Sequence, residues 1–436
     1  MKRILLIGNG AREHVIAETF KRSPQECELG VFGTAVNPGM KELAERYEIG
    51  SLADLDGIVA FAKDFGADFV FVGPENPLAD GVVDALEEAG IKCAAPTMLL
   101  AQLESSKSFT RDLVQKYDIP ANPEFRVFKE EDGLREFIEE LGEYVVKADG
   151  LMGGKGVKLS GEHLATIDEG VVWARECIEK QGHVVVEEKL VGQEFSLMSF
   201  ADGKSVVDMP AVQDHKRAYE GDEGPNTGGM GTWSDADHSL PFLRDGDIAD
   251  AHAITEAVVK ALHEETSRPY VGIMYGGFIA GKNGVRLIEY NARFGDPEAM
   301  NVLPLLKSDF VEICEAMIEG RLDEAEVEFE KKATVVKYVV PEGYPDAPVK
   351  GEKIEVGDVP EGVKAYYASV DKREDGLYLL GSRAIAFVGV ADTIEEAEKL
   401  AQSAVASVTG PVFSRADIGT AELIQKRLDH MAELRG

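Results

Sequence analysis

The first hundred residues alternate short apolar runs with segments of helical period, and this pattern limits the folds open to the chain more than any other feature. The apolar runs are ILLIG at 4–8 and FVFVG at 69–73, and amphipathic segments begin near Ala11 and near Asp80. Strands that alternate with helices in this way predict a doubly wound α/β domain at the N-terminus.

Two further domains are expected, because 436 residues exceed what a single hydrophobic core usually holds. We expect the N-terminal α/β domain to cover residues 1–104 and a central domain to cover residues 105–325. Within the central domain, a small lobe at about 122–192 could move as a lid. The remainder, 326–436, alternates strands with one helix and predicts a small C-terminal α+β domain.

Five segments carry a helical pattern after the first domain. The expected helices lie at about 97–117, 130–141, 163–180, 247–265 and 393–406. Each has apolar residues that recur every three or four positions. The lid lobe would therefore carry two helices beside its strands.

Composition excludes several classes of partner. The formal net charge of −33 argues against a nucleic-acid binder, which needs a surplus of Lys and Arg on one face. The first ten residues contain only a four-residue apolar run, too short for a secretory signal or a membrane span. The cysteines show neither zinc-site spacing nor a disulfide framework, and favour a reducing cytoplasm. They are Cys27, Cys93, Cys177 and Cys314.

A glycine-rich loop at 150–156 follows an apolar strand that ends near Lys147. Its residues Gly153, Gly154, Lys155 and Gly156 would let backbone N–H groups approach a polyphosphate. The pattern does not match a Walker A loop, which requires Ser or Thr after the lysine. The loop could also be a flexible hairpin tip, but a lysine at the strand end favours phosphate binding.

The strand VVVEEKL at 184–190 ends in charged residues. Its edge carbonyl and N–H groups near Glu187, Glu188 and Leu190 could face an adenine, and Glu194 could accept from ribose hydroxyls. A charged strand end is also typical of a solvated turn. The neighbouring motifs favour the nucleotide interpretation.

The segment LIEYNARFGDPE at 287–298 predicts a metal site. The period of a strand places Glu289, Asn291 and Arg293 on one face and Tyr290 on the other. A carboxylate beside an amide oxygen is a suitable pair of ligands for Mg²⁺ that also holds phosphate oxygens. The arginine could then bind a carboxylate or a transferring phosphoryl group. An alternating surface strand is the alternative.

The polar segments at 213–217 and 224–231 show neither helical nor strand period. A long glycine-rich polar loop is more often a ligand-binding loop than a connector, although a connector remains open here. His215 has no second histidine at ligand spacing, so we expect it to orient other groups rather than bind metal.

The sequence GNGAREH at 8–14 follows the first strand and opens a helix, an arrangement that binds phosphate. It lacks the last glycine of the dinucleotide fingerprint, because position 13 is Glu13. A monophosphate is therefore favoured over a nicotinamide cofactor.

Taken in order, six motifs resemble those of the phosphoribosylamine-glycine ligase family, the glycinamide ribonucleotide synthetases, within the ATP-grasp superfamily. The motifs are GNGAREH, GPENPL, the SKSF segment around Lys107, VVKADGLMGGKG, QDHKRA with GPNTGGMG, and IEYNARFGDPE. The resemblance extends through nearly the whole chain. It implies that the central domain has the ATP-grasp fold, with a mobile lid.

The resemblance also implies a role for each matching residue. Lys107 and Lys147 would contact the ATP phosphates, while Glu289 and Asn291 would bind Mg²⁺ or Mn²⁺. Catalytic groups would be Lys147, Asp214, Lys216 and Arg293. The substrate-binding residues would be Gly8, Asn9, Gly10, Arg12, Glu13, Glu75, Asp214, Asn226, Thr227, Gly228, Arg293 and Gly295.

The implied reaction joins glycine to 5-phosphoribosylamine through glycyl phosphate, with ATP converted to ADP and phosphate, in purine biosynthesis. It uses no covalent enzyme nucleophile, and no Ser-His-Asp or Cys-His arrangement stands out in the sequence. The partners would be small molecules, and the chain a monomer or weak homodimer. The alternatives are another ATP-grasp ligase or carboxylase, and a non-catalytic nucleotide-binding regulator.

Overall fold

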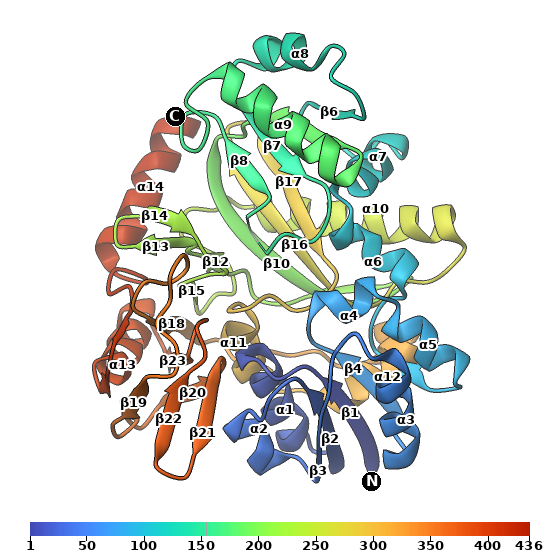
Figure 1. Ribbon diagram of the computed structural model, residues 1–436, viewed down its shortest axis with the longest axis vertical. Coiled ribbons are helices and arrows are strands. Elements are labelled where there is room, and N and C mark those ends of the chain that lie inside the picture. Colours follow the sequence, from blue (N-terminus) through green and yellow to red (C-terminus); the bar gives the residue numbers. More distant parts are fainter. Residues whose placement is uncertain (154) are drawn as a thin grey trace.

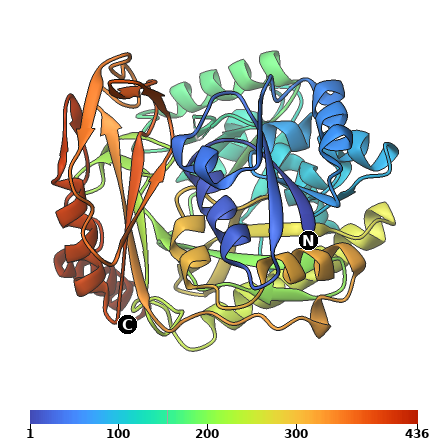
Figure 2. The same cartoon turned by 90° about the horizontal axis from the view of Figure 1, so that it is seen from below.

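The computed structural model describes residues 1–153 and 155–436. Figure 1 shows a lid lobe at the top, the N-terminal domain at the lower right and the C-terminal strands at the lower left. Figure 2, seen from below, shows the N-terminal and C-terminal regions side by side against the central region. Among the described residues, no helix is long and apolar enough to cross a membrane.

The N-terminal domain is a parallel five-stranded sheet of order β3-β2-β1-β4-β5, which confirms the doubly wound prediction. Helix α1 begins at Ala11, where the Glu13 side chain accepts a hydrogen bond from the N–H of Gly10 at 2.6 Å. The strands are Lys2–Ile7, Cys27–Gly33, Arg46–Ile49, Phe69–Val72 and Lys92–Cys93. The helices α1 to α5 are Ala11–Arg22, Pro38–Leu43, Leu55–Phe65, Glu75–Ala79 and Val82–Glu88.

The helical stretch expected at about 97–117 is present, but it is divided into two helices. These are α6, Met98–Ser105, and α7, Lys107–Lys116. Ser106 is extended and its hydroxyl accepts from the N–H of Phe109 at 3.2 Å, so it caps a new helix. The break places Lys107 at the first position of α7, next to the nucleotide loop.

The lid lobe has its own four-stranded antiparallel sheet, of order β6-β9-β7-β8. Its strands are Phe125–Phe128, Tyr144–Ala148, Val157–Leu159 and Val184–Glu188, and its helices are α8, Leu134–Leu141, and α9, Ile167–Gln181. Helix α9 begins four residues later than expected because Thr166 caps it. A separate hydrophobic cluster that includes Phe128, Phe137 and Val186 fills the lobe. A lobe with its own core can move as one body.

The central sheet has the order β11-β10-β16-β17 and is antiparallel. Its strands β10, β11, β16 and β17 are Gly192–Asp202, Val206–Asp208, Val271–Gly281 and Gly284–Asn291. Helix α10, Asp247–Thr266, packs against it. The chain then forms α11, η1, α12 and η2 at Ala299–Val302, Leu303–Leu305, Phe310–Glu319 and Leu322–Glu324.

The polar segment at 213–231 contains short strands, although its lack of a strand period predicted a loop. It forms β12, β13, β14 and β15 at Gln213–Asp214, Arg217–Tyr219, Glu223–Asn226 and Gly231–Ser234. Strands β13 and β14 make a hairpin, while β12 and β15 join the sheet of the C-terminal region. Strands this short leave no readable period.

The C-terminal region completes that sheet in the order β12-β15-β18-β23-β20, with a second sheet β21-β22-β19-β24 beside it. A single sheet therefore contains strands from both sides of residue 325, the expected end of the central domain. The strands β18 to β25 are Ala333–Pro341, Lys353–Val356, Val363–Tyr367, Val370–Arg373, Gly376–Leu379, Ile385–Ala391, Val408–Thr409 and Val412–Phe413. Helix α13, Ile394–Val405, matches the prediction, whereas α14, Ala421–Arg435, was not predicted.

Candidate active site

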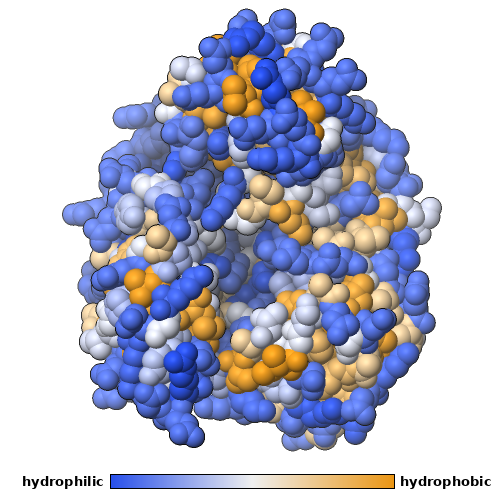
Figure 3. All heavy atoms as spheres, in the orientation of Figure 1, coloured by the Kyte–Doolittle hydropathy of each residue, from blue (hydrophilic) through white to orange (hydrophobic). Residues whose placement is uncertain are grey.

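Figure 3 shows a hollow at the centre of the face seen in Figure 1, between the lid lobe, the N-terminal domain and the C-terminal sheet. Part of it is a cavity of about 240 Å³ lined by Asn9, Gly10 and Thr34 from one side and by Ser369 and Ser382 from the other. Asp296 also lines this cavity, so the N-terminal, central and C-terminal regions all contribute to it.

Lys147 lies on β7 with its ammonium group paired to the carboxylate of Glu187 on β9. The ammonium also donates to the carbonyl of Ile288 at 3.1 Å. Arg111 of α7 binds the same carboxylate through two nitrogens, at 2.8 and 3.2 Å. Burial would raise the pKa of Glu187, but the two cations outweigh it and lower that pKa. Glu187 therefore stays ionised and holds Lys147 in place.

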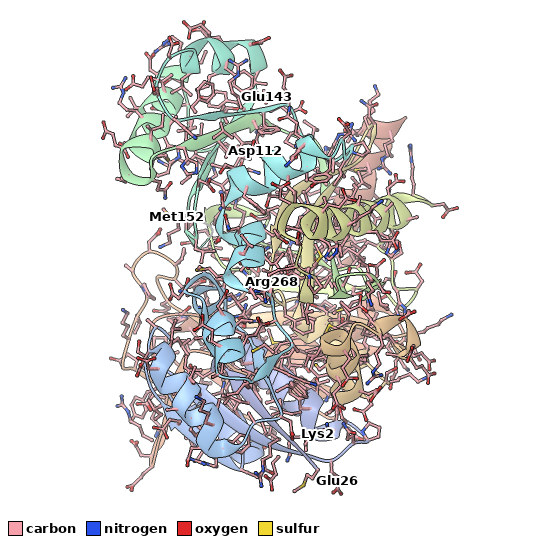
Figure 4. All side chains as sticks on the ribbon, turned by 90° about the vertical axis from the view of Figure 1, so that its right-hand side faces the viewer. Lys2, Glu26, Asp112, Glu143, Met152 and Arg268 are labelled. Atoms are coloured by element: carbon pink, nitrogen blue, oxygen red, sulfur yellow. The ribbon has the colours of Figure 1, made fainter. Side chains whose placement is uncertain are left out.

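The glycine-rich loop is tied to α7 through Asp149. Its carboxylate accepts hydrogen bonds from the N–H of Lys107, from Ser108 and from His183. The ammonium of Lys107 donates to the carbonyl of Gly150 at 2.9 Å, so this lysine lies against the loop as expected. Figure 4 labels Met152 on the same loop, below the lid lobe.

Within the loop, the described residues form a turn. The N–H of Lys155 donates to the carbonyl of Met152 at 3.0 Å, and Gly153 has a φ of +54°. The carbonyl of Gly156 accepts from the N–H of Ala148 at 2.8 Å, which closes the turn onto β7. Gly154, also predicted to contact ATP, lies outside the described residues.

The hinge between the lid lobe and the central sheet runs from β9 into β10. Glu188 ends β9, and its carboxylate accepts from the N–H of Glu124 at 2.9 Å. Leu190 follows, and Glu194 is exposed near the start of β10. The chain passes here from the lid sheet to the central sheet, and the contact of these residues with the adenosine stays a prediction.

Strand β17 shows the expected alternation. Tyr290 is only 2% exposed, while Glu289 and Asn291 are half-buried on the opposite face. The ammonium of Lys216 lies 4.0 Å from the Glu289 carboxylate. Burial would raise the pKa of Glu289, but Lys216, Lys107 and Lys147 outweigh it and lower that pKa.

The donors on β17 fit a hard divalent cation. Glu289 supplies an ionised carboxylate and Asn291 an amide oxygen, which is the chemistry that Mg²⁺ prefers. Among the described residues, no three His, Cys, Asp or Glu side chains gather as a complete metal cage. Phosphate oxygens and water would complete the coordination of a cation held by Glu289 and Asn291.

The N-terminal motif lies at the carboxyl end of the parallel sheet. The Asn9 amide oxygen accepts from the N–H of Thr34 at 2.9 Å, and Gly8 has a φ of +112° that favours glycine. Glu13 is buried and bonds both Gly10 and Arg12, each at 2.6 Å. Glu13 therefore shapes the loop, whereas Asn9 and Gly10 border the cavity.

Arg293 connects the metal-ligand strand to the N-terminal domain. Its guanidinium donates to Asn291 at 3.2 Å, to Glu104 at 2.7 Å and to Glu75 at 3.3 Å. Burial would raise the pKa of Glu75, but Arg293 and Arg12 outweigh it and lower that pKa to about 2. The predicted residues Glu75, Arg12 and Arg293 thus form one charged cluster.

Two carboxyl groups, those of the half-buried Asp214 and the buried Glu298, influence each other. Asp214 accepts from the N–H of His215 at 2.7 Å, and Glu298 accepts from the Tyr275 hydroxyl at 2.8 Å. Burial, followed by the neighbouring Glu298 charge, raises the pKa of Asp214 well above its usual value. Burial also raises the pKa of Glu298. Gly295 lies beside Glu298, where a Cβ atom would collide with its carboxylate.

The turn at Asn226, Thr227 and Gly228 is held from two directions. The Thr227 hydroxyl donates to the carbonyl of Lys216 at 2.8 Å, and Arg383 donates to the carbonyl of Gly228 at 2.7 Å. Arg383 also binds the carbonyl of Asp296 at 2.9 Å. The C-terminal domain thereby fixes the glycine-rich substrate segment.

His215 lies between β12 and β13, and its orienting role stays a prediction. The ring is buried, and its Nδ1 lies 3.4 Å from the Asp222 carboxylate in the turn of the β13–β14 hairpin. Burial lowers the pKa of His215.

Three family models match the chain in order. They are the phosphoribosylglycinamide synthetase N domain at 2–104, the ATP-grasp (A) domain at 105–299 and the C domain at 334–421. The chain belongs to the phosphoribosylglycinamide synthetase family. It is 50% identical to the phosphoribosylamine-glycine ligase of Methanosarcina acetivorans, over 100% of this chain and 98% of the relative. It is 49% identical to that of Methanocaldococcus jannaschii, over 99% and 100%.

Solved structures agree with this family. The phosphoribosylamine-glycine ligase of Thermotoga maritima superposes with a TM-score of 0.78 at 28% identity, covering 95% of this chain and 99% of that one. A biotin carboxylase from Campylobacter jejuni reaches a TM-score of 0.74 at 15% identity, covering 99% and 98%. At that identity the second likeness shows only that the fold is shared.

Sequence reasoning missed four residues of the site. Arg111, Glu104 and Arg383 each bind a predicted site residue or its segment, and the charge of Glu298 raises the pKa of Asp214. Glu298 is part of the FGDPE motif, and Glu104 is the one acidic residue of an otherwise apolar helix segment, so both had a signal. Arg111 and Arg383 had none, because their partners lie far away in the sequence.

Proposed function

We infer that this chain is an ATP-dependent ligase that joins glycine to 5-phosphoribosylamine. The products are glycinamide ribonucleotide, ADP and phosphate, in purine biosynthesis. The observation that carries this inference is the full-length match to phosphoribosylamine-glycine ligases. The cavity bordered by Asn9 and Gly10 supports it, because these residues are proposed to face the phosphoribosylamine.

The proposed chemistry has two steps. A carboxylate oxygen of glycine attacks the γ-phosphorus of ATP, so that ADP leaves and glycyl phosphate forms. The amine of phosphoribosylamine then attacks the glycyl carbonyl, phosphate leaves, and the amine loses a proton. Positioning and charge neutralisation would supply most of the rate, as in other phosphoryl transfers. A closed lid would keep water from the acyl phosphate.

We assign the groups as follows. Lys107 and Lys147 orient the phosphates, with Glu188, Leu190 and Glu194 along the adenosine. Asp214, Lys216 and Arg293 hold glycine and the transferred phosphoryl group. Asn9, Gly10 and Glu75 face the phosphoribosylamine.

Mg²⁺ or Mn²⁺, bound by Glu289 and Asn291, would neutralise phosphate charge. The domain limits of 1–104, 105–325 and 326–436, a cytoplasmic location and a monomer or weak homodimer remain our proposals. Binding of nucleic acid or membrane is not expected, given the net charge of −33.

The test is ADP release in mixtures that lack one component at a time. We expect ADP only when glycine and phosphoribosylamine, generated in the reaction because it is labile, are both present. Alanine should support far less turnover, since a pocket closed around glycine has no room for a methyl group.

Two other outcomes would favour the alternatives. Turnover that depends on bicarbonate and ignores glycine would indicate a carboxylase of the same fold. A chain that releases no ADP in any mixture but binds ATP would be a regulator.

A further inference from the structure

Glu162 is a carboxylate outside the predicted site to which three functional segments converge. It lies in the turn between β8 and α9 of the lid lobe. One carboxylate oxygen is paired with the guanidinium of Arg217, on strand β13 below the lid (Figure 1). The other lies 3.2 Å from the ammonium of Lys189 in the hinge. A single side chain thus connects lid, hinge and hairpin.

The turn that presents Glu162 is rigid. The N–H groups of His163 and Leu164 donate to the carbonyl of Leu159 at 2.9 and 3.2 Å. The His163 ring accepts from the N–H of Leu159 at 3.2 Å, and Gly161 has a φ of +76°. Backbone and side-chain bonds on both sides hold the carboxylate toward the hairpin.

The hairpin is equally fixed, because its turn is bound to the C-terminal end of the chain. Asp222 at the hairpin turn is paired with Arg415 at 3.0 Å and with Arg427 of α14. The N–H of Gly221 donates to Asp417 at 2.9 Å. Arg217 therefore projects from a rigid support, so the ion pair to Glu162 joins the lid lobe to the hairpin, in addition to the contacts that Glu187 and Asp149 make with α7.

Both partners of Glu162 are neighbours of proposed site residues. Lys189 stands between Glu188 and Leu190 at the adenosine, and Arg217 follows Lys216 at the glycine segment. The Lys216 carbonyl is in turn held by the N–H of Thr227 at 2.7 Å. A lid pinned through Glu162 is thereby held against the nucleotide end and the acceptor end at once.

We propose that Glu162 is a positioning residue that locks the lid onto the β13–β14 hairpin while glycyl phosphate exists. This inference rests on the proposed function. Without the lock, the lid opens before the amine attacks. Water then adds to the acyl phosphate and returns glycine and phosphate, while the ADP already formed is lost without product.

The experiment compares ADP released with glycinamide ribonucleotide formed, in the full-length protein with saturating substrates. Wild type should give one ADP per product. For Glu162→Gln we expect about two or more ADP per product, because loss of the lid contact admits water. The matched control is Glu131→Gln, which breaks an ion pair of 2.5 Å to Arg175 inside the lid lobe and should leave the ratio at one.

A double-mutant comparison separates a lock from a structural role. Arg217→Gln should also raise the ratio, and Glu162→Gln with Arg217→Gln together should be no worse than Glu162→Gln alone. A ratio that stays at one in Glu162→Gln, or additive effects of the two changes, would overturn the proposal even if thermal stability falls. Failure of the proposed function looks different, because wild type itself would then form no glycinamide ribonucleotide.

Discussion

The proposed nucleotide end of the site, around Lys147, and the proposed acceptor end, around Asp214, arrange their charged groups in opposite ways. At the proposed nucleotide end, the Glu187 carboxylate is paired with both Lys147 and Arg111, which leaves one net positive charge. At the acceptor end, Asp214 and Glu298 form no ion pair with any residue that the structure describes. Burial raises the pKa of both carboxyl groups. The first group is held by its own ion pairs, whereas the second presents two carboxyl groups that have no paired cation among the described residues.

This difference suits the two ligands. ATP brings a polyphosphate, which needs cations already held at fixed positions. Glycine brings an ammonium group as well as a carboxylate, and an unpaired carboxylate is a natural partner for the ammonium. The comparison leads to three variants whose effects should differ in kind as well as in size.

The largest effect is expected from Glu187→Gln. The change leaves Lys147 and Arg111 as buried cations without their carboxylate, so we expect a loss of about 3–5 kcal/mol in the free energy of unfolding. Urea unfolding measures this, with Glu179→Gln on the exposed face of α9 as the control. If both variants unfold alike, the nucleotide end does not depend on internal charge pairing and the comparison fails.

A smaller effect, on catalysis rather than stability, is expected from Lys147→Met. The methionine keeps the apolar stem but removes the phosphate contact. The transition state should lose about 1.5–3 kcal/mol of stabilisation, which lowers kcat/KM for ATP roughly 10- to 100-fold. The KM for glycine should change little. The control is Lys158→Met on the same lobe. The Lys158 ammonium lies 3.7 Å from the centroid of the Trp173 ring. An equal rise in the KM for glycine would show that the two ends are not separate.

Much of this site could be predicted from the sequence because it depends on local periods. Alternation along β17 placed Glu289 and Asn291 opposite Tyr290, and the strand-to-helix turn placed Asn9 and Gly10 at the sheet edge. Helix α14 also had readable signals, a capping threonine and apolar residues at helical spacing, and was overlooked. The family resemblance, not the periods, supplied the reaction.

The rest depends on contacts between distant residues. Arg111 and Glu187 are 76 positions apart, and no motif around either residue predicts that they pair. The sheet that joins β15 to β18 likewise unites segments about a hundred residues apart, so a boundary drawn from local composition passes through it. The helix break at Ser106 is easier to predict from the sequence, because serine is a common N-cap residue.

The smallest effect, opposite in sign, is expected from Asp214→Asn. The folded protein raises the pKa of this carboxyl group above its unfolded value, so the native state binds more protons than the unfolded chain between the two pKa values. Stability from this group is therefore fully present below the unfolded pKa and declines as pH rises toward the folded pKa. Asparagine carries no charge and removes that decline.

We expect the variant to be more stable than wild type at neutral pH by about 1 kcal/mol, with no advantage near pH 4, and much less active with glycine. Thermal unfolding from pH 4 to 8 measures the difference, and Asp237→Asn, at an exposed position, is the control. A variant that is less stable at neutral pH would mean that Asp214 is compensated within the protein, and the two ends would then be built alike.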